Sequence, residues 1–147
     1  MDELTDEVHS QVQARCSEGD RLAESGNYPG ALKQYWSAWD LLPAPQNQWE
    51  AATWILAAIG DANFLGGDFV AGRDNLSNAM HCPGAIGNPF LHLRLGQCQL
   101  ELGNLPRAND ELARAYMGGG KEIFANDDPK YFNHLKTVLQ PPAGGQW

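Results

Sequence analysis

Histidine and cysteine are the residues here with the widest chemistry, because they ligate metals, carry protons and act as nucleophiles. A zinc site needs paired ligands at short spacing. Only His81 and Cys82 are adjacent, so the spacing predicts no metal site. The full set is His9, His81, His92 and His134 with Cys16, Cys82 and Cys98.

The same residues give little sign of catalysis. Cys16 follows Arg15 inside a predicted helix, where nothing indicates a lowered thiol pKa. A Cys–His pair that meets only in the folded chain stays open as an alternative. The run from Gly118 to Lys121 follows a helix, not a strand, and has no Ser or Thr after the lysine, so it indicates a helix end rather than a phosphate loop. We predict no enzyme activity, no catalytic residue and no cofactor.

The net charge of the chain limits the kinds of partner that it is expected to bind. The chain has 147 residues, 43% of them hydrophobic, and a net charge of -8. This charge disfavours nucleic acid and anionic membranes and favours another protein with a basic or mixed-charge surface. No apolar run approaches the roughly 20 residues of a membrane span. The acidic start and the odd number of cysteines lead us to expect no secretory signal and a cytoplasmic location.

A repeat of two helices runs through the chain. Each unit has a glycine, a second glycine seven residues later, and then Asn or Asp. The first glycine is expected where the two helices approach closely, and the second where the first helix ends. Large and small residues then follow at helical spacing. The equivalent sets are Gly19, Gly60 and Gly96; Gly26, Gly67 and Gly103; Asn27, Asp68 and Asn104; Tyr35, Leu76 and Leu112; and Ala38, Ala79 and Ala115.

The pattern predicts an all-α fold in a single domain over residues 1–139. The repeats are expected at about 12–45, 53–86 and 89–122, and a capping helix at about 128–139 would cover the open end of the solenoid. The tail, 140–147, is rich in Pro and Gly and is expected to be flexible.

The spacing of glycine, aromatic residue and alanine resembles the tetratricopeptide repeat (TPR), most closely in the first unit. The resemblance implies a solenoid of helical hairpins whose first helices line a concave protein-binding groove. It does not extend to the carboxylate clamp of one chaperone-binding branch, because only Arg94 agrees with that clamp. The positions expected to bind a partner on the concave face are Gln13, Asp20, Trp54, Asp61, Phe64, Phe90, Leu93, Arg94 and Gln97.

The stretch from Gly84 to Lys136 also resembles small bacterial repeat proteins encoded beside toxins, many of which are immunity proteins. That resemblance implies a protein that binds and neutralises a cognate toxin, as a monomer or weak homodimer. An acidic cluster fits either a basic toxin or a solvated helix start. The alternative function is a chaperone or adaptor that carries a client without inhibiting it. The cluster is Asp2, Glu3, Asp6, Glu7, Glu18, Asp20 and Glu24.

The tryptophans have two interpretations. Trp36 and Trp39 are expected to pack between repeats. Trp49 or Trp54 would instead serve as an exposed anchor, because tryptophan dominates binding hot spots.

Overall fold

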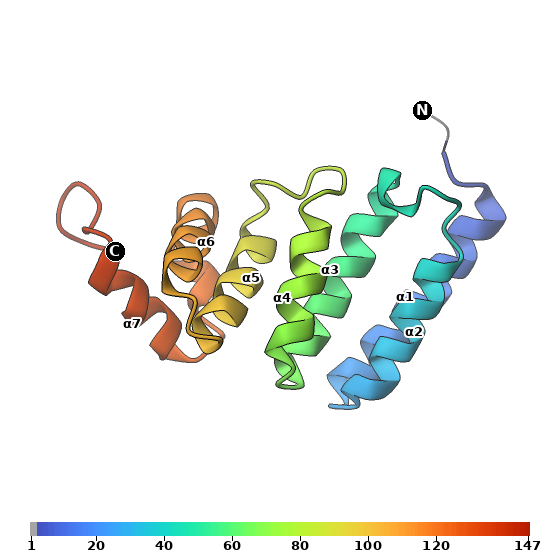
Figure 1. Cartoon of the computed structure of the whole chain (residues 1–147), viewed down its shortest axis with the longest axis horizontal. Helices are drawn as coiled ribbons and strands as arrows, with labels where there is room; N and C mark the ends of the chain where they lie inside the picture. Colours follow the sequence, from blue (N-terminus) through green and yellow to red (C-terminus); the bar gives the residue numbers. More distant parts are fainter. Residues whose placement is uncertain (1–2) are drawn as a thin grey trace. The chain divides into compact units, whose positions relative to one another are not determined.

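The computed structural model describes residues 3–147, and Asp2 of the predicted acidic cluster lies outside this range. Every regular element in the described part is a helix, which confirms the predicted all-α class (Figure 1). None of these helices is long and apolar enough to span a bilayer. The chain divides into two compact units, Met1–Ala85 and Ile86–Trp147. The prediction of one domain over residues 1–139 stays a prediction.

The first unit holds two helical hairpins. Their helices pair α1 with α2 and α3 with α4, and α2 also packs against α3. A 3-10 helix, η1, lies between α2 and α3, directly before α3. The bounds are α1 (Asp6–Glu24), α2 (Tyr28–Asp40), η1 (Gln46–Gln48), α3 (Glu50–Leu65) and α4 (Phe69–Ala79).

The second unit holds the third hairpin and the last helix. Helix α5 packs against α6, and α6 contacts both η2 and α7. The bounds are α5 (Pro89–Glu101), α6 (Leu105–Gly119), η2 (Lys121–Phe124) and α7 (Pro129–Val138).

The turn inside each hairpin uses the residues that the repeat predicts. The second glycines have φ of 83° at Gly26, 84° at Gly67 and 80° at Gly103, a left-handed backbone that favours glycine. The next residue caps the following helix in the first two repeats, where its side chain accepts from a backbone N–H. Asn104 differs, because its Nδ2 donates to Gln99 Oε1 at 3.2 Å instead.

The first glycine of each repeat lies against the large residue of the second helix. A Cβ at Gly19 would lie 2.5 Å from Tyr35 Cε1, and one at Gly96 would lie 2.8 Å from Leu112 Cγ. A Cβ at Gly60 would overlap Leu76, which is fully buried. The three glycines therefore allow the close approach of the helices, as the repeat predicts.

Gly60→Ala tests this packing. We expect the substitution to lower the free energy of unfolding by about 1–3 kcal/mol, because overpacking of a tight core outweighs the better helix propensity of alanine. Urea denaturation followed by circular dichroism measures the change. Ala58→Gly in the same helix is the control and isolates the propensity, at about 1 kcal/mol. A Gly60→Ala protein more stable than wild type would contradict the close-packing argument.

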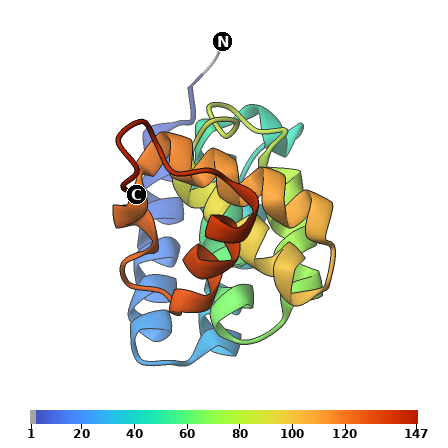
Figure 2. The same ribbon diagram turned by 90° about the vertical axis from the view of Figure 1, so that its left-hand side faces the viewer.

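Aromatic residues fill the second unit between α6, η2 and α7. The ring of Phe132 stacks on Phe124 at 5.0 Å and on Tyr116 at 6.0 Å between centroids. Trp147 meets Phe132 edge-on at 5.8 Å, so the tail makes a loop whose last residue comes back against α7 (Figures 1 and 2). The predicted flexible tail therefore has an anchoring contact at its last residue. In α7, Tyr131 and Leu135 are buried, but Val138 is exposed.

Candidate protein-binding surfaces

Helix α3 carries the most exposed aromatic side chain of the described residues. Trp54 is 59% exposed. Ala58, Asp61 and Leu65 follow it at helical spacing on the same face, and Leu65 is also exposed. An exposed indole beside an apolar side chain is typical of an interface anchor. The structure thus places Trp54 and Asp61 on one face of α3, and the binding of a partner on this face stays a prediction.

One tyrosine hydroxyl, that of Tyr35, bonds a carboxylate of α1 and is affected by the charge of another in α3. The hydroxyl of Tyr35, in α2, donates to Asp20 Oδ1 of α1 at 2.6 Å. Burial raises the pKa of Tyr35, and the hydrogen bond to Asp20 and the negative charges of Asp20 and Asp61 raise it further. Helices α1 and α3 are in contact. The charges of Asp20 and Asp61 therefore both act on Tyr35, and we call the surface formed by Asp20, Trp54, Asp61 and Leu65 the Trp54 face.

Cys16 lies near these carboxylates and is a poor nucleophile. Burial, and then the charge of Asp20, raises the pKa of its thiol from 9.0 to about 11. A reactive cysteine has a lowered pKa, so this environment favours the unreactive thiol. Burial also raises the pKa of the Cys82 thiol.

We expect Cys16 to react slowly with iodoacetamide. With the pKa raised from 9.0 to about 11, the thiolate fraction at pH 8 falls about 100-fold. Because the folded chain favours the protonated thiol, its contribution to stability is complete below pH 9 and is lost as the pH rises toward 11. Mass spectrometry of a Cys82→Ser/Cys98→Ser protein isolates Cys16, and the urea-unfolded protein is the control. Equal labelling rates in the folded and unfolded proteins would contradict the prediction.

The other predicted residues of the first unit do not all join the Trp54 face. Gln13 is exposed on α1, at the repeat position equivalent to Trp54. Phe64 is half-buried, and its ring lies 5.8 Å from that of Phe69 in α4, so it packs within the hairpin. Trp49, proposed as an alternative anchor, is buried, and its Nε1 donates to the Pro43 carbonyl at 2.8 Å.

In the second unit, the predicted binding residues are mostly buried. Phe90 is 36% exposed, but Leu93 and Gln97 are buried. Arg94 is also buried, and its guanidinium lies 5.1 Å from the centre of the Phe90 ring. These residues were expected on an open groove, and their role in binding a partner stays a prediction.

The segment after α6 explains part of this burial. Element η2 contacts α5. Beyond it, Asp127 Oδ1 accepts from Arg94 Nη1 at 3.1 Å, while the same nitrogen donates to Gln97 Oε1 at 2.8 Å. Residues of the chain itself thus accept hydrogen bonds from the guanidinium that was expected to contact a partner. Gln97 Nε2 is buried and has no hydrogen-bond partner among residues 3–147.

A second buried polar pair, His92 with Glu111, fixes the start of α5. The N–H of Gly87 donates to His92 Nε2 at 2.9 Å, and His92 Nδ1 lies 2.6 Å from Glu111 Oε2. Since a backbone N–H can only donate, Nε2 of His92 is the acceptor, and Nδ1 is left to donate to Glu111. No sequence motif marks this pair, so sequence reasoning missed it. No group of three or more His, Cys, Asp or Glu residues within 3–147 has the geometry of a metal site.

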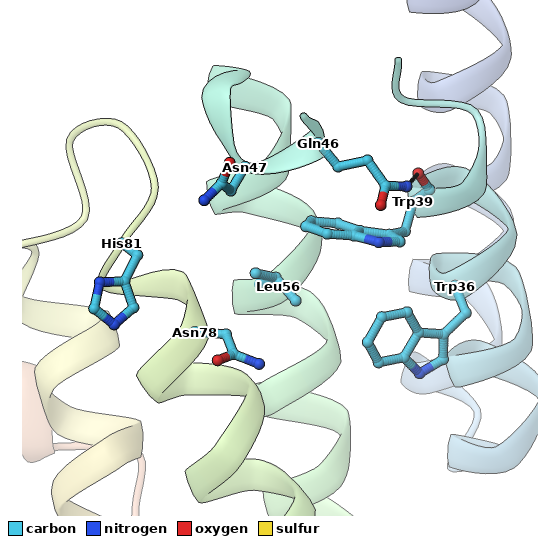
Figure 3. A pocket seen from close by; sticks show the side chains of 7 residues that line it. All are labelled: Trp36, Trp39, Gln46, Asn47, Leu56, Asn78 and His81. Carbon is cyan, nitrogen blue, oxygen red and sulfur yellow. Dashed lines mark hydrogen bonds between the residues drawn. The ribbon is translucent and has the colours of Figure 1, made fainter. Parts of the chain in front are cut away.

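A hollow of about 480 Å³ opens in the first unit, between α2, η1, α3 and α4 (Figure 3). Two tryptophans of α2 form one wall, and the buried Leu56 of α3 contributes to the lining. Sequence reasoning assigned these tryptophans to packing between repeats and missed the hollow. The lining residues are Trp36, Trp39, Gln46, Asn47, Leu56, Asn78 and His81.

No protein-family model matches the sequence, and no curated protein sequence matches it. Solved structures share the fold at low sequence identity. The first TPR domain of human RPAP3 aligns with a TM-score of 0.64 and 17% identity, over 87% of this chain and 89% of that one. The type III secretion translocator chaperone SycD of Yersinia enterocolitica aligns in an alternative dimer with a TM-score of 0.65 and 16% identity, over 88% and 92%. SycD with a peptide of the translocator YopD aligns at 0.64 and 17%, over 93% and 96%.

These structures and the three hairpins define the fold. The chain is all-helical and TPR-like, and this confirms the predicted architecture. The aligned structures are a TPR domain and a secretion chaperone.

Proposed function

We propose that this protein is a chaperone or adaptor that binds an extended segment of a client protein on the Trp54 face. The observation that carries the proposal is the 59% exposure of Trp54 on the same helix face as Asp61, which lies near Asp20 of the neighbouring helix. The indole would cover an apolar client side chain, and the exposed carboxylate of Asp20 would attract a client Lys or Arg. SycD, whose fold is similar over nearly its whole length, holds a translocator peptide.

Purification of the tagged protein from its native cell, followed by mass spectrometry, tests this function. We expect one near-stoichiometric client whose solubility or export falls when this protein is deleted. A matched purification with Trp54→Ala controls for proteins that bind elsewhere. A client that stays soluble and is exported normally without this protein would refute the chaperone role.

An immunity protein that neutralises a toxin is the second candidate. Its support is the net charge of -8, which complements a cationic toxin domain. The discriminating measurement is survival of cells that express the candidate toxin, with and without this protein. Protection from killing would favour immunity, whereas a client that is bound without any protection would favour the chaperone.

A further inference from the structure

The hollow in the first unit and the Trp54 face lie on different sides of α3. Leu56 follows Trp54 by two residues, which places it about 200° around the helix. Leu56 lines the hollow, while Trp54 points to solvent. The hollow takes none of its lining from α1, which holds Asp20 of the Trp54 face. It is therefore a separate feature from the proposed client site.

The hollow has aromatic walls, and its lining contains no acidic residue and no Lys or Arg. The rings of Trp36 and Trp39 lie 6.3 Å apart at an interplanar angle of 82°, which forms an L-shaped corner. Trp36 is 38% exposed, so its indole is open to a ligand. None of the seven lining residues is Asp, Glu, Lys or Arg, although the whole chain carries -8. Such a neutral region favours an uncharged ligand.

Most polar side-chain groups around this corner have no hydrogen-bond partner in the described chain, and many of them can donate a hydrogen bond. Within residues 3–147, the indole N–H groups of Trp36 and Trp39 and the side chains of Asn47, Asn78 and His81 make no hydrogen bond. An indole N–H can only donate, whereas a carboxamide both donates and accepts. Gln46 Nε2 donates to the Trp39 carbonyl at 2.9 Å and so steadies the rim. The site therefore offers more donors than acceptors.

We infer that this hollow binds a proline-rich segment of another protein in the polyproline II conformation. Proline has a flat, apolar ring that fits an aromatic corner, and it has a carbonyl acceptor but no N–H donor. A proline-rich segment thus matches both the tryptophan walls and the excess of donors. Its preformed extended conformation also loses little entropy on binding. The volume of about 480 Å³ lies in the range of ligand pockets.

A blocked decaproline peptide is the probe, and the indole N–H signals of the ¹⁵N-labelled full chain are the readout. We expect the Trp36 and Trp39 signals to shift, with half-saturation below about 1 mM, while the Trp54 signal stays in place. A blocked Gly-Ser peptide of equal length is the ligand control. Trp36→Ala should weaken binding at least about tenfold, and Trp54→Ala should leave it unchanged.

Trp36→Phe separates stacking from hydrogen bonding, because it keeps an aromatic ring and loses the N–H donor. We expect it to bind decaproline more weakly than wild type and more tightly than Trp36→Ala. Circular dichroism confirms that each variant is folded. The proposal is overturned by the absence of a saturable shift, by equal shifts with the Gly-Ser peptide, or by undiminished binding to folded Trp36→Ala. Binding of maltohexaose at this corner without binding of decaproline would also overturn it, by making the site saccharide-specific.

Discussion

Asp127→Ala is expected to lower the free energy of unfolding of the second unit by about 3 kcal/mol. The substitution removes a carboxylate from Arg94, whose side chain is only 11% exposed. Desolvating a guanidinium is costly, and the loss of the Asp127 carboxylate removes part of the interaction that offsets this cost. We place the loss near the lower end of the range for buried pairs, because Gln97 Oε1 still accepts from Arg94.

The chain offers a matched control on its surface. Arg73 and Asp74 form an ion pair at 3.0 Å, close to the 3.1 Å of Arg94 and Asp127, but their side chains are 37% and 60% exposed. Asp74→Ala should therefore change stability by less than about 1 kcal/mol. Urea titrations of both variants, followed by circular dichroism, give the comparison, and Asp127→Asn tests whether charge or shape matters. Equal losses for Asp127→Ala and Asp74→Ala would show that burial does not strengthen the inner pair.

The hairpins of this fold were predictable because each depends on a short-range constraint. Every repeat has one glycine at a left-handed turn and one glycine under a large side chain, always at the same repeat positions. The roles of Gly26 and Gly60 could therefore be predicted from spacing alone. Their equivalents recur at the same offset from Tyr35, Leu76 and Leu112. A local rule that repeats three times is strong evidence within a single sequence.

The candidate site was less predictable because it depends on contacts between distant residues. Arg94 meets Asp127 across 33 positions, and no spacing rule links them. The repeat pattern places Arg94 and Gln97 on a concave face, but it does not contain the segment that follows α6. Residues that a repeat exposes can thus be covered by chain outside the repeat.

The tryptophans show the opposite case, in which side chains that the sequence pattern assigns to the core line an open hollow. Helical spacing brings Trp36 and Trp39 to one side of α2, and apolar residues at such positions are ordinarily core. The hollow beside them depends on Gln46, Asn47 and Asn78 from other elements. Only the folded chain shows that these two rings meet at 82° and that Trp36 is open to solvent.

Trp54→Ala should weaken binding of the client, or of a toxin that uses the same face, by about 30-fold, which equals about 2 kcal/mol. Truncation removes the large indole that would be covered at the centre of the interface. The partner recovered by affinity purification supplies the ligand for calorimetric titration. Val70→Ala, at an exposed position of α4 where Val70 is 50% exposed, is the control and should change the dissociation constant by less than about threefold.

The Trp54→Ala variant also shows whether Trp54 is an interface anchor or a residue of the core. Since Trp54 is 59% exposed, its truncation should leave the helical signal intact and change the free energy of unfolding by less than about 1 kcal/mol. A folded Trp54→Ala protein with wild-type affinity would move the partner to another surface. An unfolded variant would instead make Trp54 part of the core. Weaker binding by a folded protein is the result that requires the Trp54 face, because neither loss of structure nor a distant interface produces it.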